Sequence, residues 1–126
     1  MSGRRDPHYP GKATIDGYGA GGFRFAGMSH KGSILATPSG IRAFAPQTAA
    51  EIDAASLAPV FADAAAIELL IIGTGRDIVP VARELCGKLK EAGIAVDPMP
   101  TAAATSTYNI LLGEDRKVAA ALIAVV

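Results

Sequence analysis

The residues with the clearest chemical potential form a polar turn directly after an apolar run: Gly73, Thr74, Gly75, Arg76 and Asp77. Glycine lets a backbone turn tightly and expose its N–H groups, and Arg76 adds a positive charge beside them. When a helix begins just beyond such a turn, the N–H groups of its first turn can hold a phosphate or a carboxylate. The turn is therefore a candidate site for a small anion or for a partner protein.

Part of a dinucleotide-binding fingerprint surrounds this turn. An acidic residue, Asp97, follows about 20 positions later, where a ribose contact would lie. However, the fingerprint G-x-G-x-x-G needs a third glycine where Ile78 stands, and no Gly-Lys-Ser/Thr follows for a Walker A loop. A dinucleotide site is thus disfavoured. Two interpretations stay open: contact with a small anion or partner, and a plain tight turn whose glycines adopt positive φ.

A second group of polar residues, Thr107, Tyr108 and Asn109, lies inside a predicted helix. Threonine and asparagine disfavour helix interiors, because threonine is branched at Cβ and the asparagine amide competes for backbone hydrogen bonds. These residues could face the same cleft as the polar turn and complete a binding site there. The alternative, slightly favoured, is that Tyr108 packs in the core while Thr107 and Asn109 form local hydrogen bonds.

Residues for catalysis or metal binding are sparse. The single cysteine, Cys86, lies on the apolar side of a predicted helix, where we expect a buried, inert thiol. His8 and His30 have no metal-ligand companion at a suitable spacing. Ser29 is adjacent to His30 but lacks the Gly-x-Ser-x-Gly elbow of hydrolases. The sequence therefore favours a non-catalytic protein, and it assigns no catalytic residue, metal or cofactor.

The elements of the first half are predicted to be mostly strands. Residues 1–12 mix charged residues with proline and glycine and are predicted to form a disordered tail. Short alternating segments then predict a β-meander, in which Met28 to Gly32 form a turn. Ser56 is the candidate cap of a short helix at 57–64. The predicted strands are 14–18, 23–27, 33–37 and 41–45.

The second half alternates strands and helices, which predicts parallel neighbouring strands. Asp77 is the candidate N-cap of the helix after the polar turn, Pro80 suits its first turn, and Gly93 suits its end. Thr101 is the candidate cap of the next helix. The predicted elements are a strand at 67–72, a helix between Asp77 and Gly93, a strand at 94–97, a helix at 101–112 and a strand at 118–126.

Size and composition exclude several classes of protein. With 126 residues the chain can bury the core of one domain, which we expect to span residues 13–126. A formal net charge of zero, from 12 basic and 12 acidic side chains, argues against nucleic acid as the main partner. No run approaches the roughly 18 apolar residues of a membrane span. The first residues lack the apolar core of a signal peptide, so we expect a cytoplasmic protein.

Four segments, taken in order, resemble the Mth938-like family of unknown function, which includes a mitochondrial assembly factor of respiratory complex I. The segments are IIGTG at 71–75, LCGKLKEAGIAVD at 85–97, TYNIL at 107–111 and EDRKVAAAL at 114–122. The resemblance covers residues 14–125 and implies an α/β fold with three layers, β/β/α. In that fold an N-terminal β-meander forms one layer, and a C-terminal βαβαβ parallel sheet is backed by helices.

The resemblance also implies a soluble adaptor or assembly factor for a membrane protein complex, which acts by protein contact and has no catalytic residues. Some bacterial relatives are encoded beside preprotein translocase subunits. We therefore expect assembly or translocase components as partners, in a bacterium, with a position in the cytoplasm or peripheral to the inner membrane. Two alternatives stay open: a small-ligand binder or enzyme that uses Gly73 to Asp77 for an anion or nucleotide, and a structural homo-oligomer.

Overall fold

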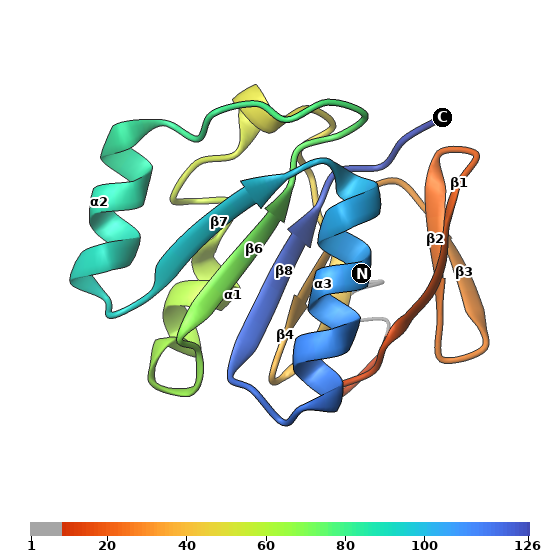
Figure 1. The fold of residues 1–126 in the computed structure, drawn as a ribbon, viewed down its shortest axis with the longest axis horizontal. Helices are drawn as coiled ribbons and strands as arrows, with labels where there is room; N and C mark the ends of the chain where they lie inside the picture. Colours follow the sequence, from red (N-terminus) through yellow and green to blue (C-terminus); the bar gives the residue numbers. More distant parts are fainter. Residues whose placement is uncertain (1–8) are drawn as a thin grey trace, which may run out of the picture.

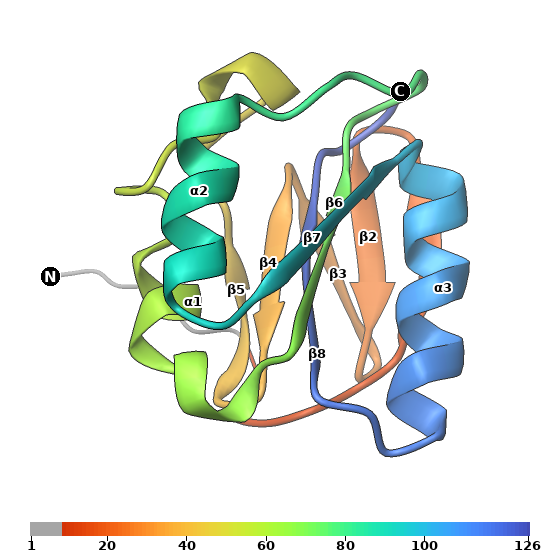
Figure 2. The same ribbon diagram turned by 60° about the vertical axis from the view of Figure 1, so that its left-hand side comes forward.

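The computed structural model describes residues 9–126, which form three layers around a central five-stranded sheet (Figure 1). Helices α1 (Ala58–Ala62) and α2 (Arg83–Glu91) pack on one face of this sheet. Helix α3 (Thr101–Gly113) and a separate three-stranded sheet pack on its other face, as the turned view shows (Figure 2). The three-layer α/β architecture that the family resemblance implied is confirmed.

The central sheet is mixed, with strand order β5-β4-β8-β6-β7. Its strands are β4 (Ile34–Thr37), β5 (Gly40–Ala43), β6 (Leu69–Gly73), β7 (Ala95–Met99) and β8 (Val118–Leu122). β6 is parallel to β7 and to β8, as predicted, whereas β4 is antiparallel to β5 and to β8. The second half of the predicted meander therefore joins the central sheet instead of the outer layer.

The outer layer consists of β1 (Ile15–Gly19), β2 (Gly22–Phe25) and β3 (Met28–Lys31), all antiparallel. The predicted turn from Met28 to Gly32 is wrong, because Met28 to Lys31 pair with β2 along their whole length. The chain already reverses at Ala26 and Gly27, with φ of 50° and 75°. Two successive positive φ values are typical of a tight hairpin turn, for which alanine is an uncommon residue.

Strand alternation divides the core into two clusters, one on each face of the central sheet. Leu70 and Ile72 face α1 and α2, whereas Ile71 between them faces α3 and the small sheet. β8 alternates in the same way, with Ala119 and Ala121 on the first side. The continuous apolar runs of β6 and β8 are thus those of strands covered on both faces.

The connecting helices are shorter than predicted. Ser56 does not cap α1, because its hydroxyl donates to the carbonyl oxygen of Asp53 at 2.8 Å and accepts from the N–H of Asp53 at 3.0 Å. The remaining short helices are two 3-10 turns, Ala49–Glu51 and Ala64–Ala66. Within residues 9–126, no helix combines the length and apolar character needed to cross a membrane.

The end of α2 follows the prediction, but its start does not. Gly93 has φ of 83°, and its N–H donates to the carbonyl oxygen of Lys90. The N–H of Ile94 donates to the carbonyl oxygen of Leu89 at 2.9 Å. This pair of bonds is a Schellman motif. The predicted N-cap at Asp77 is wrong, since α2 begins only at Arg83 after an exposed loop.

Three further boundaries differ from the prediction. β8 ends at Leu122, whereas the strand was predicted to continue to residue 126. β7 continues through Pro98, which an edge strand tolerates because its second side needs no N–H donor. At the start of the described chain, Tyr9 pairs with Ile41 of β5 through backbone bonds of 3.1 and 2.9 Å. The first eight residues of the predicted tail, which include His8, lie outside the described residues.

Candidate functional site

The polar turn lies at the carboxyl end of β6, beside the start of α3 and the end of β8. Thr101, which is fully buried, connects the three segments. Its Oγ1 accepts from the N–H of Gly75 at 2.9 Å and donates to the carbonyl oxygen of Ile123 at 2.8 Å. The predicted cap at Thr101 is therefore wrong: Pro100 is the N-cap residue, and the Thr101 hydroxyl joins turn, helix and strand.

Thr74 holds the following loop against the end of the sheet. Its Oγ1 donates to the carbonyl oxygen of Asp77 at 2.6 Å and accepts from the N–H of Val79 at 3.1 Å. Its own N–H donates to the carbonyl oxygen of Met99 at the end of β7. These bonds fold the loop back onto the turn. The loop therefore cannot enter the helix at Asp77, and α2 starts later.

The structure explains why both Gly73 and Gly75 of the turn are glycine. Gly75 has φ of 109°, a conformation that side chains rarely adopt. A Cβ on Gly73 would lie 3.0 Å from Thr101 Oγ1 and 3.1 Å from the Cβ of Ala104, so a side chain there would crowd the first turn of α3 and require it to shift. Gly73, Thr74 and Gly75 are buried, and Arg76 and Asp77 are exposed.

Arg76 borders a small hollow of about 150 Å³ where distant segments meet. It is lined by Tyr18, Gly75, Arg76, Ala102, Val125 and Val126. The Nη2 of Arg76 donates to the carbonyl oxygen of Val126 at 3.4 Å, and the N–H of Gly21 donates to that of Val125 at 2.7 Å. The hairpin tip between β1 and β2, the loop after β6 and the C-terminal segment thus crowd together at one end of the molecule (Figures 1 and 2).

Exposed apolar side chains accompany Arg76 at this end. Ile78 is 61% exposed, Tyr18 46% and Val79 37%. We call this region the carboxyl-end surface, defined by Tyr18, Gly75, Arg76, Ile78, Val79, Ala102, Val125 and Val126. It combines the cation Arg76 with exposed apolar side chains, and the exposed carboxylate of Asp77 lies in the same loop between Arg76 and Ile78.

Thr107, Tyr108 and Asn109 are not brought to this surface. They lie on later turns of α3, beyond Thr101. Tyr108 is 1% exposed in the core, and burial raises its pKa from 10.0 to about 12. Asn109 accepts from the N–H of Ile15 and donates to the carbonyl oxygen of Ile15, both at 2.8 Å. Its bonds are long-range, not local as expected, and they attach β1 to α3.

The other chemically capable residues are separated from the turn. Cys86 is half-buried on α2 and borders a hollow with Lys90 and Val96. His30 and Ser29 lie in β3, with His30 half-buried. Across residues 9–126, no three His, Cys, Asp or Glu side chains gather in a way that could hold a metal ion. Tyr18, Ala102 and Val125 were not predicted as lining residues, because only the folded topology brings them to Arg76.

Comparison with known proteins supplies a family and a named relative. An assembly factor of Danio rerio, NADH dehydrogenase [ubiquinone] 1 alpha subcomplex assembly factor 3, is 33% identical over 110 residues. The match covers 87% of this chain and 63% of that protein, so the chain spans less than two thirds of this relative.

Two solved structures share the fold over nearly the whole chain. A crystal structure described as an outer membrane protein from Bartonella henselae superposes with a TM-score of 0.91 and 46% identity, covering 94% of this chain and 100% of that chain. The solution structure of a Bordetella pertussis protein, a Mth938-like domain, gives a TM-score of 0.78 at 28% identity, covering 98% and 92%. Residues 15–123 match the family described as "Protein of unknown function (DUF498/DUF598)". The chain therefore belongs to the DUF498 family and has the Mth938-like fold.

Proposed function

We propose that this protein is a non-catalytic assembly factor for a membrane protein complex and that it acts by protein contact through the carboxyl-end surface. The name of the Danio rerio relative supports an assembly role and makes the NADH dehydrogenase complex the first partner to test. Translocase components remain the second group of partners to test.

The observation that carries this proposal is the cluster of exposed apolar side chains beside Arg76. Single exposed apolar residues are ordinary, but several gathered on one surface mark a place where another protein binds. Thr74 and Thr101 hold this surface rigid through hydrogen bonds. A partner would therefore lose little free energy in ordering the loop, which is a recurring cost of association.

Affinity purification from detergent-solubilised membranes tests the proposal. The tagged wild-type protein should recover subunits of one membrane complex reproducibly, measured by quantitative mass spectrometry. Ile78→Ser removes an exposed apolar contact and Arg76→Glu reverses the charge, so each should lower that recovery by roughly tenfold, as expected for loss of a central contact. Arg83→Glu makes the same charge change on exposed α2 and is the matched control.

Two results would contradict the proposal. One is the absence of any reproducible partner with the wild-type protein. The other is equal recovery by wild type, Ile78→Ser and Arg76→Glu, which would separate partner binding from the carboxyl-end surface.

A second candidate function is small-anion binding in the hollow beside Arg76. Arg76 lines that hollow together with Ala102, and Ala102 lies in the first turn of α3. The N-terminus of a helix favours negative charge. The hollow holds about 150 Å³. Sites for drug-sized ligands start at roughly 300 Å³, so this one suits a phosphate or carboxylate group and not a whole nucleotide.

Thermal unfolding with inorganic phosphate, acetate and nucleotides distinguishes this function from the first. Binding should stabilise the protein by about 2.7 kcal/mol at a hundredfold excess over Kd. Phosphate should raise the Tm of the wild type but not that of Arg76→Gln. A flat response to every compound would rule this function out.

A further inference from the structure

The outward face of the three-stranded sheet combines glycines with two long cationic side chains. Phe23 and Phe25 on the other face are 2% and 1% exposed, so strand alternation turns their neighbours to solvent. The register places the outward residues in two rows across the strands: Gly17, Arg24 and Ser29, then Gly19, Gly22 and Lys31. Half of these positions are glycine. We call this region the glycine face.

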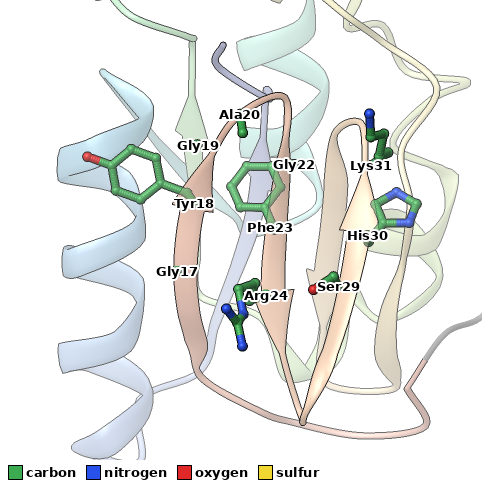
Figure 3. Close-up of a pocket in the computed structure, with 10 residues that line it drawn as sticks. All are labelled: Gly17, Tyr18, Gly19, Ala20, Gly22, Phe23, Arg24, Ser29, His30 and Lys31. Atoms are coloured by element: carbon green, nitrogen blue, oxygen red, sulfur yellow. The ribbon is translucent and has the colours of Figure 1, made fainter.

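The glycine face borders a hollow of about 360 Å³, which Figure 3 shows with its lining residues. Arg24 leans from β2 toward β1 in this view. A Cβ built on Gly17 would lie 3.9 Å from Cδ of Arg24, so the arginine stem borders the floor at Gly17. Glycine inside a strand often marks a place where a ligand or another backbone approaches closely. At Gly22 the close neighbour is backbone, because Gly22 is buried and a Cβ there would collide with the carbonyl oxygen of His30 in β3. Gly17 and Gly19 meet no such neighbour and are the positions open to a ligand.

The charged side chains that line this hollow, Arg24 and Lys31, have one sign. Arg24 and Lys31 are both exposed and occupy diagonal positions on adjacent strands, which places their Cβ atoms roughly 7–8 Å apart. The hydroxyl of Ser29 lies in the same row as Arg24. Within the residues of these three strands the one acid is Asp16, in the irregularity of β1 between Ile15 and Gly17. Two cations therefore flank a nearly bare floor.

The size of the face favours a small molecule over a protein. Three strands of four residues cover on the order of 150–200 Å². A stable protein interface needs about 800 Å² from each partner. A hollow of about 360 Å³, in contrast, lies within the range of small-ligand sites, which begins near 300 Å³.

We propose that the glycine face binds a small organic anion with two acidic groups, such as a dicarboxylate, a tricarboxylate or a pyrophosphate. Arg24 pairs with one acidic group through its planar guanidinium, and Lys31 pairs with the other. Ser29 donates a hydrogen bond to the first group. The body of the ligand lies on the floor formed by Gly17 and Gly19. This site shares Tyr18 with the carboxyl-end surface, but it does not depend on the proposed assembly role.

A ¹H–¹⁵N NMR titration of the full chain with citrate, succinate, pyrophosphate and acetate tests the proposal. At least one di- or trianion should shift the backbone signals of Gly17, Gly22 and Lys31 saturably. Acetate, with a single charge, should bind at least roughly tenfold more weakly. The affinity should fall as sodium chloride is added, because salt screens exposed charges.

Two kinds of variant distinguish the contribution of the cations to anion affinity from that of the open floor. Arg24→Gln and Lys31→Gln should each weaken binding by roughly tenfold, since each loses one charge-assisted contact. Gly17→Val should block the floor while both cations remain, and it should fold, because Gly17 has no positive φ and a Cβ there meets only ordinary contacts. Arg83→Gln on α2 is the control and should bind like wild type. Circular dichroism confirms that each variant is folded.

Several outcomes would overturn the proposal. These are shifts that never saturate, shifts that sodium chloride reproduces at equal ionic strength, and full binding by Arg24→Gln. Saturable shifts confined to Arg76 and Ala102 would also overturn it and would support the anion site at the carboxyl-end surface. If Gly17→Val does not fold, the comparison of Arg24→Gln with Arg83→Gln still decides the result.

Discussion

At the scale of single residues, the buried hydroxyl groups of Thr74, Thr101 and Tyr108 differ in their hydrogen bonds. The Oγ1 of Thr101 joins the polar turn to the segment after β8, and the Oγ1 of Thr74 bonds two backbone groups of the loop that follows it. The hydroxyl of Tyr108 has only a long contact of 3.5 Å with the carbonyl oxygen of Ala13. Burial, and not a charged neighbour, raises the pKa of Tyr108 to about 12. Deprotonation of this phenol must therefore be coupled to folding.

Tyr108 should make the protein lose stability in alkali. A folded-state pKa above the unfolded value of 10.0 means that the full stabilisation is present below pH 10 and is lost as the pH rises toward 12. Each unit of pKa corresponds to about 1.4 kcal/mol. Denaturant unfolding at pH 8, 10 and 11.5 should show a steeper loss for wild type than for Tyr108→Phe.

Tyr108→Phe is a near-isosteric change, and the comparison cancels the titration of the other tyrosines and the lysines. At pH 8 we expect the two proteins to differ by less than about 1 kcal/mol, because the hydrogen bond lost is weak. Parallel stability curves from pH 8 to 11.5 would contradict a raised pKa for Tyr108.

At the scale of elements, α3 connects the two sheets. Its buried face packs on the central sheet through Ala104 and Tyr108. Its side carries Asn109, whose amide forms two hydrogen bonds to the backbone of Ile15 in β1. Through its oxygen and one of its two N–H groups, the Asn109 amide thus pairs with the backbone of Ile15 as a neighbouring strand residue would. The position of the small sheet, and with it the glycine face, depends on this contact.

Asn109→Ala should loosen the small sheet before it unfolds the protein. Loss of both bonds leaves the N–H and carbonyl of buried Ile15 without these partners, which costs on the order of 1–3 kcal/mol. The higher helix propensity of alanine returns roughly 0.6 kcal/mol. We therefore expect a net loss of about 1–2 kcal/mol in denaturant unfolding and faster hydrogen exchange in β1 than in β6.

Ser106→Ala is the matched control for this change. Ser106 is exposed on the same helix, and its substitution brings a similar gain in propensity without loss of a contact to Ile15. It should leave stability within about 0.5 kcal/mol of wild type. Equal exchange rates in β1 for wild type and Asn109→Ala would show that Asn109 does not hold the small sheet.

At the scale of the whole molecule, secondary structure was predicted best where the residues that determine an element lie within that element. The apolar runs of β6 and β8, the helix end at Gly93 and the parallel order of the second half are of this kind. β3 was missed because Met28 to Lys31 are mostly polar and because the turn has alanine at its first position, before Gly27, where asparagine, aspartate or glycine is usual. The start of α2 was missed because the Thr74 hydroxyl bonds the backbone of Asp77 and Val79 and holds these residues in a loop. The prediction assigned Asp77 as a helix cap and did not consider this local alternative.

The candidate site was predictable only in part. Position along the chain indicated Gly73 to Asp77, which follow a buried strand. It could not indicate that Tyr18 and Val125 meet Arg76, since those residues come from opposite ends of the chain. Nor could it separate Asn109 from the turn, because the partner of Asn109 lies 94 residues away.

Tyr18 lines both the hollow beside Arg76 and the hollow of the glycine face. The hairpin that carries it is also bonded to the C-terminal segment through Gly21 and Val125. Two occupants on either side of one shared side chain cannot bind independently if either one moves it. The change that an anion on the glycine face makes to partner affinity must equal the change that the partner makes to anion affinity. If both proposed occupants bind, anion binding on the glycine face and partner binding beside Arg76 would therefore be coupled through Tyr18.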